Sequence, residues 1–171
     1  EAGPSGLRLL RLVDGRTGKA TAVGLPAFSV TAGATVLAST RLRLAGPPRV
    51  GELPAVQGAS RRSDGIPGRQ IAVELVDEEG AFRVAWRAIL RSGSSYLRQE
   101  VTITAGAADV PVTEVCLVDL AIDGVLTGNV KGSPVAAGTW FFGLEHPLST
   151  SWAAQGRIRC ALARALPLRA G

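Results

Sequence analysis

The stretch 82–104 constrains the fold more than any other part of the sequence, because apolar and polar residues alternate there with a period of two. Phe82 and Val84 share one parity, and Arg83 and Arg87 share the other. After a turn rich in serine and glycine, the same alternation resumes and continues to the end of the stretch. Successive side chains of a strand point to opposite faces. The stretch therefore predicts a long antiparallel hairpin with one face toward solvent.

Shorter strands are predicted along the rest of the chain, with turn residues such as Asp14-Gly15 between them. Their expected ranges are 7–12, 40–44, 71–75, 112–122 and 158–162. No window carries the helical spacing i, i+3, i+4, i+7 over three turns. Residues 46–68, rich in Gly, Pro, Ser and Arg, are expected to form a long surface loop or a ragged edge. We predict one all-β domain over 1–171, an antiparallel two-sheet sandwich.

Composition excludes several classes of protein. With 46% hydrophobic residues, the chain is globular and not disordered. No apolar run approaches the roughly 20 residues that cross a bilayer, so no membrane partner is expected. The formal charge of +5 comes almost wholly from arginine, and most arginines stand singly among apolar residues. That spacing is typical of the solvated face of a sheet and argues against nucleic acid as a partner.

The segment before Leu7 contains neither an initiator methionine nor an apolar signal region. We expect the chain to be a mature product or a fragment of a longer multidomain protein. We expect that protein to be exported, to the periplasm or outside the cell.

The two cysteines, Cys116 and Cys160, match neither a zinc site nor a redox Cys-x-x-Cys. Simple alternation places Cys116 with Val118 and Leu120, on a largely apolar face. Two readings stay open at this point: buried free thiols, or a disulfide between strands of an exported protein.

The chain shows no catalytic apparatus. His146 is its only histidine, so a nucleophile–histidine arrangement could be built only there. No Gly-rich loop precedes a helix to hold a phosphate, and no pair of carboxylates is marked out for glycoside cleavage. We expect no catalytic residue, no metal and no cofactor.

The most informative feature is a run of three aromatic residues, Trp140, Phe141 and Phe142, shortly before His146. Neighbours in a strand point to opposite faces, so all three cannot enter one core. One reading is an exposed platform for a sugar or an interface with another domain. The other is that loops cover both faces locally and all three are core.

Glu145 and His146 follow the aromatic run and are expected at the exit of a strand. Pro147 ends any ladder there. Binding residues often lie at such positions, although a solvated turn accounts for either residue alone. Trp152 either lines the same surface or packs on it.

These stretches resemble signatures of large bacterial glycosidases, often labelled enterotoxin-like and similar to the α-galactosidase class. The resemblance is carried by 132–135 and 141–149, and by 80–88 leading to 94–100. It implies a galactose mutarotase-like supersandwich placed ahead of a catalytic (β/α) barrel that holds both catalytic carboxylates.

The resemblance also implies that, as in related enzymes, a loop of the front domain lies over the mouth of the barrel and shapes the sugar pocket. The matching residues here are Phe141, Phe142, Glu145 and His146, and Trp140 directly precedes them. The implied function is a non-catalytic accessory domain of a glycoside hydrolase. Its expected partners are carbohydrate and a barrel downstream in the same protein.

Two other functions remain open. An independent carbohydrate-binding module would stack Trp140 or Trp152 on a pyranose ring. A structural or interaction sandwich of an exported protein would need no site at all.

Overall fold

The structure is a computed structural model that describes residues 1–171. It contains sixteen β-strands and two single 3₁₀ turns, η1 (Ser39–Arg41) and η2 (Arg62–Gly65). The first eight strands are β1 (Ala2–Gly3), β2 (Gly6–Val13), β3 (Ala20–Pro26), β4 (Ser29–Ala32), β5 (Thr35–Ala38), β6 (Arg43–Leu44), β7 (Arg49–Leu53) and β8 (Gly68–Val76). The others are β9 (Phe82–Arg91), β10 (Leu97–Ala105), β11 (Val112–Leu120), β12 (Val125–Leu126), β13 (Val135–Ala137), β14 (Trp140–Phe142), β15 (Thr150–Ala154) and β16 (Arg157–Ala163).

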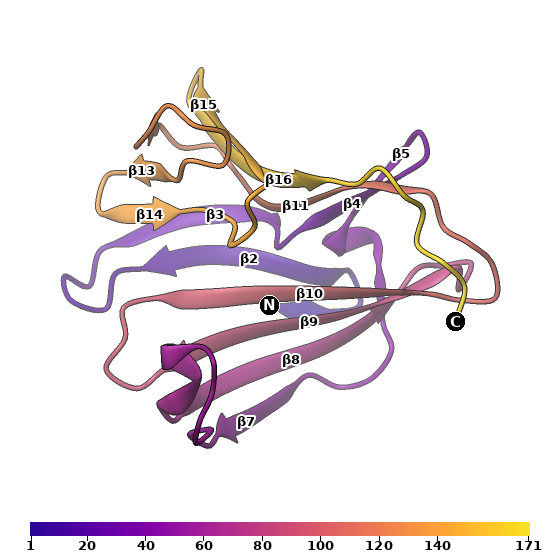
Figure 1. Ribbon diagram of the computed structural model, residues 1–171, viewed down its shortest axis with the longest axis horizontal. Helices are drawn as coiled ribbons and strands as arrows, with labels where there is room; N and C mark the ends of the chain where they lie inside the picture. Colours follow the sequence, from indigo (N-terminus) through magenta and orange to yellow (C-terminus); the bar gives the residue numbers. More distant parts are fainter.

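Two five-stranded sheets form the layers of the molecule (Figure 1). The first, which we call the β8–β9 sheet, has the order β10-β9-β8-β6, with β7 also paired to β8. The second, the β11–β16 sheet, has the order β15-β16-β11-β4-β5. Two three-stranded sheets, β1-β2-β3 and β12-β13-β14, complete the fold, and every pair of strands is antiparallel.

This architecture confirms the predicted all-β, antiparallel, sandwich-like fold. The mutarotase-like type of sandwich stays a prediction. The structure contains no helix of the length and apolar character that a membrane span requires.

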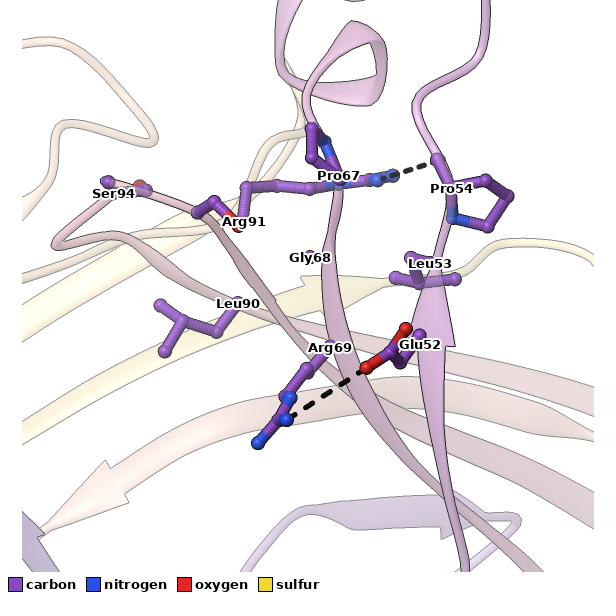
Figure 2. A pocket seen from close by; sticks show the side chains of 11 residues that line it. Glu52, Leu53, Pro54, Pro67, Gly68, Arg69, Leu90, Arg91 and Ser94 are labelled. Atoms are coloured by element: carbon purple, nitrogen blue, oxygen red, sulfur yellow. Dashed lines mark hydrogen bonds and ion pairs between the residues drawn. The ribbon is translucent and has the colours of Figure 1, made fainter.

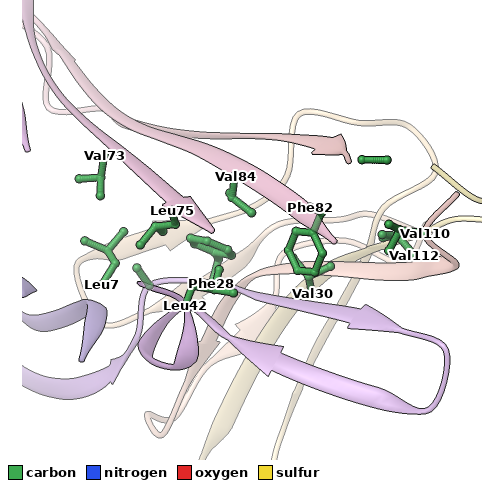
Figure 3. Packing of buried hydrophobic residues seen from close by; sticks show 12 residues of the cluster. Leu7, Phe28, Val30, Leu42, Val73, Leu75, Phe82, Val84, Val110 and Val112 are labelled. Carbon is green, nitrogen blue, oxygen red and sulfur yellow. The ribbon is translucent and has the colours of Figure 1, made fainter. Parts of the chain in front are cut away.

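Two clusters of buried side chains hold the layers together. The larger one lies between the two five-stranded sheets, where Phe28 and Val30 meet Leu75, Phe82 and Val84 (Figure 3). The smaller one joins the other end of the β11–β16 sheet to the β12–β14 sheet and to the β2–β3 ribbon. Its buried members are Leu120, Val135, Ala137, Ile158 and Cys160.

The hairpin predicted over 82–104 is present as β9 and β10, paired without interruption from Leu97–Leu90 to Ala105–Phe82. Arg83 and Arg87 point away from the core, as predicted. Leu90 is exposed even though it shares the inner face with Phe82. The larger core contains Phe82, Val84 and Ala105, at one end of the hairpin, whereas Leu90 lies at the other end.

One expected segment differs from the structure, and a second agrees with one of its two alternatives. Residues 40–44 were expected as a strand, but the 3₁₀ turn η1 takes up 40–41, and only Arg43 and Leu44 pair, as β6. Residues 46–68, expected as a loop or a ragged edge, form the edge strand β7 along β8, followed by a loop that contains η2. Arg91 holds this segment in place by donating to the Ile66 carbonyl at 2.8 Å and to Asp64 Oδ1 at 3.0 Å. The alternation of residues within a segment does not show which strand it pairs with, so the pairing of β7 with β8 could not be predicted.

Ser39 occupies the corner where the chain leaves the β11–β16 sheet and enters the β8–β9 sheet. Its side chain is fully buried. The hydroxyl donates to the Leu7 carbonyl at 2.6 Å and accepts from the Ala27 amide at 2.9 Å. One side chain thus ties β2 and the β3–β4 connection to this corner, and satisfies backbone groups that have no water available.

Gly6 packs against the same corner. A Cβ at this position would lie 2.1 Å from the Ser39 carbonyl oxygen and 2.6 Å from that of Leu42. Its φ of 74° is also in the left-handed region, which glycine adopts at little cost. The close approach of the two backbone segments therefore requires glycine here.

We expect Ser39→Ala to lower the free energy of unfolding by about 1–3 kcal/mol, because it leaves a buried amide and a buried carbonyl without their partner. Urea denaturation followed by tryptophan fluorescence measures the loss. Ser5→Ala, at an exposed position, is the matched control and should change little. Equal stability of the two variants would contradict the structural role given to Ser39.

Candidate functional site

The three consecutive aromatic residues form β14, and their side chains alternate as predicted. Phe141 is 68% exposed, whereas Phe142 packs against the smaller core. Trp140 is half-buried on the same side as Phe142. The three rings do not all enter one core, and Phe141 is the one that faces outward.

Phe141 lies in a short apolar row across the β12–β14 sheet. The register places it beside Ala136, and Ala136 beside Val125. Val125 is exposed to a similar extent, at 67%. This row contains no polar side chain that could recognise a hydroxyl group.

Glu145 sits at the centre of an ion-pair cluster rather than in an open site. Its carboxylate lies 3.3 Å from the Arg61 guanidinium and 3.2 Å from that of Arg98. The Tyr96 hydroxyl donates to Glu145 Oε1 at 2.5 Å. Three segments that are distant in the sequence therefore meet at one carboxylate, which holds the 143–149 loop against the β9–β10 hairpin.

The pKa of Tyr96 responds to this arrangement. Partial burial of the phenol, the hydrogen bond to Glu145 and the negative charge of that carboxylate together raise the pKa of Tyr96 to about 12. All of these effects favour the neutral phenol.

His146 makes only local contacts. Its Nδ1 accepts a hydrogen bond from the Leu148 amide at 3.1 Å, and its carbonyl accepts one from the Ser149 amide at 3.0 Å. The side chain is exposed. The residue therefore shapes the turn before β15, as expected of a turn residue, and has no acidic or nucleophilic partner.

Trp152 lies on a different surface from the other predicted site residues. Its neighbour Ala153 packs into the smaller core, so Trp152 points to the outer face of the β11–β16 sheet. The residue is 45% exposed. The structure thus separates Trp152 from the loop 140–146, which covers the inner face of the same sheet.

A row of polar side chains continues from Trp152 across that outer face. In the register, Trp152 pairs with Arg159 on β16, and Arg159 pairs with Asp119 on β11. Side chains directly opposite each other in this way have Cβ atoms about 4.5–5.5 Å apart. The side chain of Arg159 therefore starts directly beside the exposed Trp152.

Two bidentate ion pairs fix the polar groups of this row. Arg157 donates to both oxygens of Asp119, at 2.5 and 2.7 Å. Arg159 donates to both oxygens of Glu114. Such fork-like pairs hold guanidinium planes in a fixed orientation. We call this surface, formed by Trp152, Arg157, Arg159, Asp119 and Glu114, the Trp152 face.

Sequence reasoning named Trp152 but missed the four charged residues around it. Their grouping depends on the register between β11 and β16, which lie far apart in the sequence. It also missed the partners of Glu145. The one available signal was Arg98, which shares its parity with Glu100 and therefore faces outward in the predicted hairpin.

A hollow on the surface lies elsewhere, between the ends of β7, β8 and β9 (Figure 2). It has a volume of about 590 Å³ and contains none of the predicted site residues. Gly68 lines it, and a Cβ there would lie 2.5 Å from the Leu90 carbonyl oxygen. Arg69 and Glu52 face each other across it at 3.9 Å.

Both cysteines are free and buried. A register shift between Cys116 and Val118 breaks the alternation of β11. As a result Cys116 sits opposite Ala161, on the outer side, while Cys160 belongs to the smaller core. The expected grouping of Cys116 with Val118 and Leu120 is wrong for this reason. The two thiols point to opposite faces of one sheet, so the structure favours the reading as free thiols over the disulfide.

No group of three or more histidine, cysteine or acidic side chains is placed to hold a metal ion. Comparison of the chain with known protein families, with curated proteins and with solved structures finds no match. The resemblance to glycosidase front domains therefore stays a prediction.

We expect both cysteines to react with a thiol reagent only after unfolding, because burial raises the pKa of Cys116 to about 11 and also raises that of Cys160, and the thiolate is the reactive form. Titration without reductant should count two thiols per chain in denaturant and almost none in the folded protein. A count of zero in denaturant would establish the disulfide instead.

Tyr96 is the only tyrosine, so its ionisation can be followed by the ultraviolet absorbance of phenolate. We expect Glu145→Gln to lower the pKa of Tyr96, but not to that of a free phenol, since burial remains. The folded pKa lies above the unfolded value, so this group stabilises the fold below about pH 10 and the contribution is lost between about 10 and 12. Glu78→Gln, in an exposed turn, is the control. An unchanged titration in Glu145→Gln would contradict the cluster.

Proposed function

We propose that the chain is a non-catalytic carbohydrate-binding β-sandwich, an accessory module of a glycoside hydrolase. The Trp152 face is its sugar-binding surface. The observation that carries this proposal is the row Trp152–Arg159–Asp119, in which an exposed indole adjoins charged groups of fixed orientation.

The chemistry of a pyranose ring fits such a row. The carbon-bound hydrogens of the ring form an apolar face that packs on an indole, while its hydroxyl groups need donors and acceptors at the edge. Arg159 supplies donors and Asp119 supplies an acceptor. Because their ion pairs already hold these groups in place, little side-chain entropy is lost on binding.

The absence of a nucleophile–histidine arrangement supports a non-catalytic role. His146 contacts only its own turn, and Glu145 is engaged by two arginines and a tyrosine. We place the sugar on the Trp152 face and not on the 140–146 loop that the family resemblance indicates, because polar side chains adjoin Trp152, whereas the exposed Phe141 has only Ala136 and Val125 in its row.

A second candidate is supported by the apolar row Val125–Ala136–Phe141. An accessory domain that packs on a catalytic barrel needs an exposed apolar surface, and this row provides one. In this role Phe141 would be covered by the barrel. The coding sequence downstream of Gly171 tests the idea, since it should continue into alternating strands and helices.

Titration of the chain with galacto-oligosaccharides by calorimetry tests the first proposal. We expect Trp152→Ala to weaken binding about tenfold or more, equivalent to about 1.4 kcal/mol, because the stacking surface is removed. Leu166→Ala, which truncates another well-exposed apolar side chain, is the matched control and should bind as the unaltered chain does.

The alternatives give different results in the same experiment. Binding that survives Trp152→Ala but is abolished by Phe141→Ala would place the sugar at the aromatic loop. Cleavage of aryl α-galactosides by the chain alone would refute the non-catalytic role.

A further inference from the structure

The outer face of the β8–β9 sheet gathers arginines that are scattered in the sequence. Beside Arg91, which pairs with Asp64, five of them point outward from four strands: Arg43, Arg49, Arg83, Arg87 and Arg98. Only two glutamates, Glu74 and Glu100, share the face with them. The excess of three positive charges is more than half of the formal charge of +5. We call this surface the arginine face.

The register arranges these arginines on both sides of β8. Arg43 and Arg83 flank Val76 in one row, and Arg49 and Arg87 flank Ala72 in another. Neighbouring strands lie about 4.8 Å apart, so the two arginines of each row stand roughly 10 Å apart at their Cα atoms. Between the two lines of arginine, β8 presents a strip formed by Ala72, Glu74 and Val76.

Ion pairs do not neutralise this face. Arg87 and Arg98 both pair with Glu100, and Arg49 approaches Glu74 at 4.0 Å. Arg98 shares Glu145 with Arg61, which brings its own positive charge. No carboxylate pairs with Arg43 or Arg83, although both are exposed. These two guanidiniums are free to bind an anion.

The face has the chemistry for a linear polymer that carries both acid and hydroxyl groups. Thr102 and Thr104 lie beside the arginines of β9, in register with Ala85 and Arg83, and they donate to and accept from hydroxyl groups. Glu74 stands in the middle of the strip, so the acidic groups of a bound polymer should lie over the arginines on either side and away from this carboxylate.

Nucleic acid fits this face less well. The outward side chains of the strip include no aromatic ring on which a base could stack. The structure contains no α-helix that could enter a groove. We therefore propose that the arginine face binds an acidic polysaccharide along β8, with Arg43 and Arg83 as its principal contacts. This site is separate from the Trp152 face and does not rest on the proposed function.

Binding of polygalacturonate and of dextran sulfate, each measured over a range of salt concentrations, tests the inference, with neutral dextran as the uncharged reference. We expect the acidic polymers to bind and neutral dextran not to bind. The double substitution Arg43→Gln/Arg83→Gln should weaken binding about tenfold and lower the slope of log affinity against log salt by about two, because two ionic contacts are lost. Glu74→Gln should strengthen binding.

The control is Arg11→Gln/Arg16→Gln, which removes the same charge from the exposed β2–β3 hairpin. Trp152→Ala separates this inference from the proposed function, since it should leave polygalacturonate binding unchanged. An equal loss in both double variants would mean that only the overall charge matters, and would overturn the site. Tighter binding of a DNA oligonucleotide than of polygalacturonate would overturn the assignment to polysaccharide.

Discussion

The buried hydroxyl of Ser39 is the interaction on which the arrangement of the layers depends. The chain must pass from one five-stranded sheet to the other, and a crossing inside a core leaves backbone groups without water. Ser39 resolves this by bonding to Leu7 and Ala27 at once, while Gly6 allows the backbones to approach. Because β2 is anchored at this corner, the β2–β3 ribbon is directed over the smaller core, and the β12–β14 sheet closes the other side. The outer faces that carry the proposed sites follow from this packing.

Alternation in the sequence predicted the long strands well, but it gave no range for β3, β4, β5 or β15 and no information on which strands pair. The faces of the hairpin β9–β10 were predicted correctly over most of its length, because each residue of a regular strand reports its own side; at one end the burial is reversed, with Ile89 buried and Leu90 exposed. The parity of Cys116 was predicted wrongly, because a register shift in β11 is not visible in the residues themselves. The segment 46–68 was expected as a loop or a ragged edge, but the bounds and partner of the edge strand β7 were not predicted, because its pairing with β8 is decided by tertiary contacts and not by its own composition.

In the candidate sites too, features that depend on neighbouring residues were predicted, and contacts between distant segments were not. The outward position of Phe141 followed from three adjacent rings in one strand, and the structure agrees. The role of Glu145 could not be predicted, since its partners Arg61 and Arg98 come from segments far away in the sequence. Arginines that stand singly along the chain were interpreted as dispersed. The sheet instead places several of them on one side, because residues of equal parity on neighbouring strands share a face.

The Trp152 face and the arginine face lie on opposite outsides of the sandwich, since the inner faces of the two large sheets pack against each other. A ligand held on one side leaves the other side open. If both proposed surfaces were occupied by polysaccharide chains, each copy of the protein would cross-link two of these chains. The rigid core between them would then set the spacing of the resulting network.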